Sequence, residues 1–161
     1  MSERIKVGMA DFNICKAPDS IITLGLGSCV GIVLYDRNQK LCGMLHAMLP
    51  DSTKIRNNSN RAKFVDTGFL DLLALLEKNG VKKENLVAKL AGGAQMFNFS
   101  GNTDISAIGQ RNVDAAKEIL AKHKIRIVAE DTGLDYGRTI EFYPEDGVLE
   151  VRAVGKGVTK L

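Results

Sequence analysis

Short apolar runs, broken by Asp, Asn, Gly and Pro, fill the first third of the chain. Runs of this length that are rich in branched and aromatic side chains are typical of β-strands, and the polar residues between them are typical of turns. The pattern predicts four extended segments at residues 5–14, 20–26, 30–36 and 40–49, with a hairpin turn at residues 36–39.

In two later segments the apolar residues recur with the spacing of a helix. Over residues 64–80, apolar side chains recur three and four positions apart, and Asn79 and Gly80 favour termination. The predicted buried face of this helix consists of Val65, Phe69, Leu72, Leu73 and Leu76. A second helix is predicted over residues 110–123. Its apolar face holds Val113, Ala116 and Leu120.

The remaining segments complete the predicted fold. Residues 51–63 have no apolar period and are expected to form an exposed loop. Further strands are predicted at residues 85–93, 125–133, 137–144 and 147–154. A turn at residues 144–147, which begins with a proline, joins the last two. Two helices and these strands, without a repeat or linker, predict one α+β domain over residues 1–161 with layered α/β/β architecture.

Composition and charge narrow the class of protein. Hydrophobic residues make up 45% and charged residues 25% of the 161 residues, as in ordinary soluble globular proteins. No apolar run reaches the ~18 residues of a membrane span, and the amino terminus lacks the apolar core of a secretory signal. A cytoplasmic protein without direct membrane insertion is therefore expected. The net charge of +3 is scattered and aromatics are few, which does not indicate nucleic-acid binding.

Three cysteines and two histidines limit the chemistry that the side chains support. Without a C-x-x-C pair, they favour neither a disulfide framework nor a zinc site. Cys15 and Cys42 lie inside apolar strands and are interpreted as small buried residues. Cys29 follows a glycine-rich run where a substrate has room to approach, so it is either a nucleophile or another buried thiol. The same turn offers backbone N–H groups as an oxyanion hole.

A cysteine nucleophile of this kind needs a base, and His46 and His123 are the two candidates. His123 lies at the end of the second predicted helix beside lysines, where a cation is favoured for structural reasons. His46 interrupts an apolar strand and shares a face with Met44, so its imidazole needs a polar partner. The hydroxyl of Thr23, on a neighbouring predicted strand, is a candidate third member. Taken singly, a strand histidine such as His46 is more often a hydrogen-bonded core residue, and a threonine such as Thr23 is more often present because it favours strands. Only the combination of these residues with Cys29 is informative.

Six blocks of sequence, in order, resemble the CheD family of chemoreceptor glutamine deamidases. They are "TLGLGSCVGIVLYD", "GMLHAMLPDS", "KLAGGAQMF", "IGQRNVDAAKEIL", "AEDTG" and "GRTIEF". The resemblance runs from about Lys6 to Val154. One departure is visible: the chain reads "TGLD" where the family pattern has "TGGN", which places Leu134 and Asp135 in this loop.

The resemblance implies a three-layer α/β/β cysteine-hydrolase fold with mixed sheets and two main helices, similar to that of the deamidating cytotoxic necrotizing factors. It implies that Cys29 is the nucleophile, His46 the general base and then acid, and Thr23 the residue that orients His46. No metal or organic cofactor is implied. The implied substrates are glutamines on the cytoplasmic helices of methyl-accepting chemotaxis receptors. The implied protein partner is the CheC-type phosphatase of the response regulator CheY.

Other functions are compatible with the same residues. The main alternative is an interaction protein that binds receptors and the phosphatase, with catalysis absent or secondary. Transfer of the acyl group to an amine, or hydrolysis of a glutamate methyl ester, would use the same thiol.

Two surfaces are hypothesised to make the protein contacts. The first is a basic loop that would steer acidic receptor helices toward the site. Its basic residues are Lys54, Arg56, Arg61 and Lys63. The second is a partner-docking patch at Phe97 and Phe99. The alternative for the basic loop is an ordinary solvated loop. The alternative for the two phenylalanines is that they cap the hydrophobic core.

Overall fold

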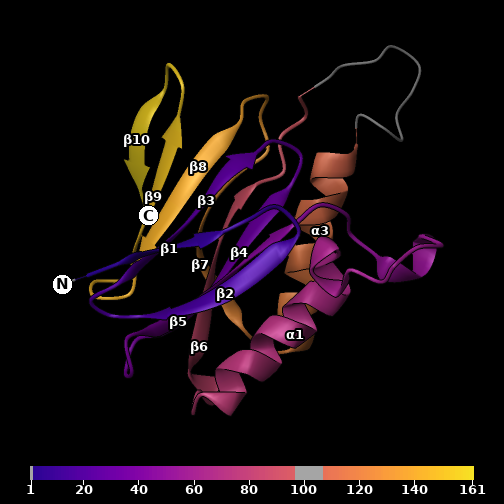
Figure 1. The fold of residues 1–161 in the computed structure, drawn as a ribbon. Helices are drawn as coiled ribbons and strands as arrows, with labels where there is room; N and C mark the ends of the chain where they lie inside the picture. Colours follow the sequence, from indigo (N-terminus) through magenta and orange to yellow (C-terminus); the bar gives the residue numbers. More distant parts are fainter. Residues whose placement is uncertain (1, 97–106) are drawn as a thin grey trace.

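The computed structural model describes residues 2–96 and 107–161, which form two five-stranded sheets and two α-helices (Figure 1). The strands are β1 (Arg4–Val7), β2 (Asp11–Lys16), β3 (Ser20–Leu26), β4 (Val30–Asp36), β5 (Leu41–Ala47), β6 (Leu86–Gly92), β7 (Arg126–Thr132), β8 (Arg138–Tyr143), β9 (Val148–Ala153) and β10 (Gly157–Lys160). The helices are α1 (Val65–Lys78) and α3 (Ile108–Lys122). Short 3-10 helices cover Ser52–Lys54, Arg61–Lys63 and Lys83–Asn85.

The strands are divided between two mixed sheets. The outer sheet has the strand order β1-β3-β8-β9-β10, and the central sheet has the order β2-β5-β4-β6-β7. Neighbouring strands are antiparallel, except that β1 pairs with β3 and β6 pairs with β7 in parallel. The mixed character of the sheets agrees with the expectation from the sequence.

The central sheet has a hydrophobic core on each of its faces. Leu45 and Ala47 of β5 join the core that α1 and α3 cover, whereas Met44 joins the core between the two sheets. This alternation is that of a strand whose successive side chains point to opposite faces. The resulting order of layers is helices, central sheet and outer sheet, so the predicted α+β class and α/β/β layering are confirmed.

Both predicted helices are present, and their predicted apolar faces are buried. The five apolar residues predicted for the face of α1 are all buried, as are the three predicted for α3. Helix α3 begins at Ile108, two residues before the predicted start. None of the helices in the described part of the chain is long and apolar enough to span a membrane.

The sequence prediction is wrong at both ends of the chain. The predicted first strand is two strands, because Ala10 takes a φ of +55° in the turn after β1. β1 then pairs with β3 in the outer sheet, whereas β2 pairs with β5 in the central sheet. Strand β10 has no counterpart among the predicted strands, because its residues are exposed throughout and carry no apolar pattern.

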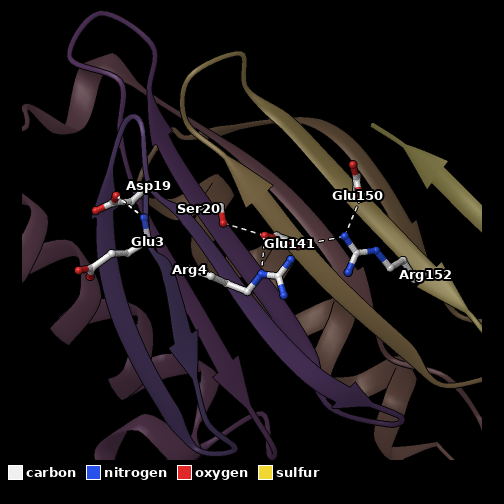
Figure 2. Close-up of polar contacts among 7 residues, drawn as sticks. All are labelled: Glu3, Arg4, Asp19, Ser20, Glu141, Glu150 and Arg152. Atoms are coloured by element: carbon white, nitrogen blue, oxygen red, sulfur yellow. Dashed lines mark hydrogen bonds and ion pairs between the residues drawn. The ribbon is translucent and has the colours of Figure 1, made fainter. Parts of the chain in front are cut away.

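A polar network covers the solvent face of the outer sheet around Glu141 (Figure 2). The two neighbours of Glu141 in β8 face the core between the sheets, so its own side chain points to the opposite face. There the carboxylate accepts hydrogen bonds from Ser20 Oγ at 2.7 Å, Arg4 Nε at 3.0 Å and Arg152 Nη2 at 3.0 Å. Only 1% of the Glu141 side chain is exposed. The network therefore joins β1, β3, β8 and β9 through one buried charge.

Candidate active site

Cys29 lies directly before β4, on a segment held by the glycine pair that ends β6. The backbone N–H of Gly93 donates to the Cys29 carbonyl at 2.8 Å, and the N–H of Ala94 donates to the Gly27 carbonyl at 2.9 Å. At Gly92 a Cβ atom would collide with the Cys29 carbonyl oxygen, and its φ of +101° favours glycine. The glycines of this block therefore allow two backbones to pack closely and fix the position of Cys29.

His46 is fully buried between the sheets and is in contact with Thr23. Their atoms Nδ1 and Oγ1 lie 2.7 Å apart, and the Thr23 hydroxyl also lies 2.8 Å from the carbonyl oxygen of Val7. A carbonyl oxygen only accepts, so the hydroxyl donates to Val7 and its oxygen accepts Nδ1–H of His46. Within the described residues, Nε2 of His46 is buried and has no hydrogen-bond partner. The network thus leaves Nε2 as the unprotonated, basic nitrogen.

Cys29 and His46 occupy the same face of the central sheet. His46 pairs with Gly31 across β4 and β5, and Cys29 lies two residues before Gly31. Cys29 belongs to the core between the sheets, as does Met44, two residues before His46. The structure therefore places all three predicted site residues between the sheets, with Thr23 bonded to His46 but no hydrogen bond between His46 Nε2 and Cys29.

Burial favours the neutral forms of both Cys29 and His46. Desolvation raises the pKa of the Cys29 thiol, and a hydrogen bond from its own backbone N–H only partly opposes this. Desolvation also lowers the pKa of His46. Both shifts favour a thiol and a neutral imidazole over a thiolate and an imidazolium in the unliganded site. Such a pair supports attack assisted by a general base, in which the imidazole takes the thiol proton as the sulfur bonds to the substrate.

Asn112 is a polar residue of this region that the sequence patterns did not indicate. It is fully buried in the second turn of α3, and its Nδ2 donates to the carbonyls of Ser28 at 2.9 Å and Met48 at 3.0 Å. These carbonyls lie one residue before Cys29 and two residues after His46. An available signal was its place four residues before Ala116, on the predicted apolar face of the helix.

The remaining cysteines and the second histidine lie in structural positions. Cys15 and Cys42 face each other across β2 and β5, and both are buried, as predicted. His123 caps the carboxyl end of α3 and packs against the ring of Phe69, with ring centroids 5.1 Å apart. In residues 2–96 and 107–161, no group of three or more His, Cys, Asp or Glu side chains is arranged to hold a metal ion.

The structure describes the first of the two hypothesised contact surfaces and leaves its role untested. Within the basic loop, Arg61 forms a bidentate ion pair with Asp71, at 2.8 and 2.9 Å, so its charge is engaged inside the protein. The carbonyl of Lys63 accepts hydrogen bonds from the backbone of Met48 and Leu49, which places this loop beside the end of β5. The patch at positions 97 and 99 lies outside the described residues.

The loop that departs from the family pattern keeps a backbone suited to glycine. Leu134 has a φ of +61°, which is unfavourable for a residue with a side chain, and it is 65% exposed. Its carbonyl accepts a hydrogen bond from the N–H of Gln95 at 2.8 Å. The departure therefore places an exposed leucine side chain on a loop whose backbone is in the left-handed region.

Comparison with family models and with related sequences points to one family. A family model described as "CheD chemotactic sensory transduction" matches residues 48–153. A protein of Lachnoclostridium phytofermentans named "Probable chemoreceptor glutamine deamidase CheD" is 61% identical over 161 residues and covers 100% of both chains. One of the same name from Caldanaerobacter subterraneus subsp. tengcongensis is 56% identical and covers 98% of this chain and 97% of its own.

Two further matches complete the comparison. The "Chemoreceptor glutamine deamidase CheD" of Halalkalibacterium halodurans is 52% identical and covers 98% of each chain. Among solved structures, the Neisseria meningitidis protein NMB0706, of family-model DUF152, aligns with a TM-score of 0.49 and 10% identity over 81% of this chain and 64% of that chain. This structural similarity is too low to inform the function.

Proposed function

The chain belongs to the CheD family, and we propose that it hydrolyses the side-chain amide of specific glutamines in methyl-accepting chemotaxis receptors. The products are a glutamate side chain and ammonia. The observation that best supports this function is the Thr23–His46 contact, which leaves Nε2 of His46 as a base on the same face of the sheet as Cys29. The names of the relatives support the substrate class.

The proposed first step forms a thioester. His46 Nε2 accepts the proton of the Cys29 thiol while the sulfur attacks the carboxamide carbon. Negative charge develops on the amide oxygen, and backbone N–H groups of the turn that carries Cys29 are proposed to stabilise that charge. The imidazolium then gives its proton to the leaving nitrogen, and the C–N bond breaks to release ammonia.

The second step hydrolyses the thioester and regenerates the site. Water attacks the acyl carbon while His46 Nε2 accepts one of its protons. The C–S bond breaks, the proton passes to the sulfur of Cys29, and glutamate leaves. Thr23 keeps the imidazole in one orientation through both steps by accepting Nδ1–H. These steps require no metal ion or organic cofactor.

The wider setting of this activity is also part of the proposal. One CheD-like domain spans residues 1–161 and acts in the cytoplasm, where the receptor helices carry their glutamines. A CheC-type phosphatase of CheY is the proposed regulatory partner and competes with receptors for the protein. The basic loop beside β5 is proposed to attract acidic receptor helices, with Lys54, Arg56 and Lys63 as the cations, since Arg61 is paired with Asp71.

The decisive experiment is mass spectrometry of a receptor cytoplasmic fragment incubated with the purified protein. We expect conversion of glutamine to glutamate with the wild-type chain and none with Cys29→Ala. Cys15→Ala removes a buried thiol of β2, outside the site, and is the matched control that should keep its activity. Conversion that persists in Cys29→Ala would refute the assigned nucleophile.

The same experiment separates the alternatives. Absence of conversion with every variant, together with binding of the fragment, would favour the interaction protein over the enzyme. An added primary amine that appears in the product would reveal transfer in place of hydrolysis.

A further inference from the structure

Asn112 bridges the two segments that carry the candidate nucleophile and base. The last paired residues of β4 and β5 at this end are Val30 and Ala47. Ser28 and Met48 lie just beyond this pair, and their carbonyls both accept from Nδ2 of Asn112, at 2.9 and 3.0 Å. The side chain therefore extends the connection between the two strands past the end of their ladder.

The chemistry of the bridge fixes the orientation of the amide. Both partners are carbonyl oxygens, which only accept, so the two hydrogens of Nδ2 must face them. Oδ1 then points elsewhere, and within the described residues it is buried and has no partner.

Close packing of glycines sets the position of α3, and with it the position of Asn112. Gly109 lies three residues before Asn112, and a Cβ there would collide with the Ala94 carbonyl oxygen and lie 2.7 Å from that of Gly93. Gly93 in turn donates its N–H to the Cys29 carbonyl. The start of α3, the glycine pair and the Cys29 segment thus form one stack of backbones with no room between them.

We propose that Asn112 is a positioning residue that sets the spacing between Cys29 and His46. It does so by holding the carbonyls of Ser28 and Met48 on one amide nitrogen. The inference rests on the proposed function of this site, because it assigns Asn112 a role in that reaction. Displacement of a reacting group by about 1 Å can cost 10²-fold in rate, so such a bridge affects turnover directly.

The first test compares Asn112→Asp with the wild-type chain in the deamidation assay. The change keeps the size of the side chain but turns both donors into an oxygen that repels the two carbonyls. We expect kcat to fall about 10²-fold with little change in KM. Asn79→Asp is the matched control, because the exposed Asn79 uses the same amide nitrogen to bond the Leu75 carbonyl at 2.8 Å, and it should keep wild-type kcat.

The second test measures the rate at which iodoacetamide alkylates Cys29 and so does not depend on receptor turnover. In the wild-type chain, His46→Gln should slow alkylation near neutral pH, because the base is lost. In the Asn112→Asp chain, the same His46→Gln change should have little further effect, since the bridge that couples the two groups is already broken. In the Asn79→Asp chain the effect of His46→Gln should be as large as in the wild type.

The outcomes separate this inference from the proposed function. A folded Asn112→Asp protein with wild-type kcat and an unchanged response to His46→Gln overturns the positioning role. The wild-type chain can also fail to deamidate while its Cys29 alkylation still responds to His46→Gln only when Asn112 is present. That result overturns the proposed function and keeps the positioning role. If Asn112→Asp does not fold, Asn112→Ser takes its place, because the serine hydroxyl keeps one donor. Its kcat and the response of its Cys29 alkylation to His46→Gln should each be partly reduced. Wild-type values of both would overturn the inference.

Discussion

The Thr23 hydroxyl oxygen lies 2.7 Å from Nδ1 of His46, although the two residues come from different sheets. The parallel pairing of β1 with β3 places Val7 opposite Thr23, and the hydroxyl donates to the Val7 carbonyl at 2.8 Å. That bond uses the hydroxyl hydrogen and leaves the oxygen as an acceptor for Nδ1–H. The pairing of an amino-terminal strand thus determines which nitrogen of a buried histidine is basic.

Thr23→Val should lower activity without changing the shape of the site. Valine has nearly the volume of threonine but can neither accept Nδ1–H of His46 nor donate to the Val7 carbonyl. We expect kcat to fall at least about 10-fold, and by less than the roughly 10²- to 10⁴-fold expected for loss of the general base itself. Thr23→Ser keeps the hydroxyl and should retain most of the activity. Equal activity of the valine and wild-type proteins would contradict the orienting role.

The thiol of Cys29 should react slowly at neutral pH. Burial raises its pKa, and the thiolate is the reactive form, so the folded protein should be alkylated more slowly than a free cysteine. The rate should still be rising above pH ~8.5, where a free thiol is half ionised. Peptide mass spectrometry follows Cys29 apart from the two other cysteines, and the urea-unfolded chain gives the reference profile. A midpoint below that of the unfolded chain would instead show a preformed thiolate and imidazolium.

Much of the site's layout was available from the sequence, because strand alternation is a local signal. The face shared by His46 and Met44, opposite Leu45 and Ala47, follows from the period of β5 alone and is confirmed. The contact between Thr23 and His46 does not follow from strand alternation. It depends on stacking two sheets, and no periodicity within either strand specifies which sheets stack.

Asn112 and the amino-terminal strands show why other parts could not be predicted. Asn112 acts on Ser28 and Met48, 84 and 64 residues away in sequence, so its role exists only after the chain has folded. The split between β1 and β2 depends on a left-handed turn at Ala10, a residue that carries no turn signal. In both cases the deciding contacts join segments that are separated in sequence and meet only in the folded chain.

Gly92→Ala should both destabilise the protein and disturb Cys29. Its φ of +101° alone costs a residue with a side chain about 1 to 3 kcal/mol, and the added Cβ would collide with the Cys29 carbonyl oxygen. Gly155→Ala is the matched control, because Gly155 has a φ of +76° but no atom within 4 Å of the added Cβ. Urea unfolding should show a larger loss for Gly92→Ala, and only this variant should lose deamidation. Equal effects on both would remove the steric argument.

Charge reversal in the basic loop should weaken recognition of the receptor but leave the fold intact. Lys54→Glu with Arg56→Glu changes two exposed cations near the end of β5. We expect a higher KM for the receptor fragment, most clearly at low ionic strength, because such steering is screened by salt. Lys82→Glu with Arg126→Glu makes the same charge change at the opposite end of the central sheet and should leave KM unaltered. An unchanged KM in the loop variant would eliminate the steering hypothesis.

Glu141→Gln should destabilise the protein at neutral pH and matter less in acid. Burial by itself would raise the pKa of Glu141, but the hydrogen bonds from Ser20, Arg152 and Arg4 outweigh it and hold the pKa below the ordinary value. A carboxylate whose folded pKa is depressed stabilises the fold above its unfolded pKa of about 4.3, and this contribution is lost as the pH falls through the folded pKa. We expect Glu141→Gln to lower the free energy of unfolding by about 1 to 3 kcal/mol at pH 7.

The difference between the two proteins should then shrink as the pH falls below about 4, because the wild-type carboxylate becomes protonated and loses its ionic partners. Urea unfolding at a series of pH values measures it. Glu145→Gln is the matched control, since that exposed carboxylate pairs with Lys40 on the surface at 3.1 Å and should contribute less than about 1 kcal/mol at any pH. A Glu141→Gln effect that stays constant from neutral to acid pH would show that the glutamate stabilises the outer sheet by packing and not by its charge.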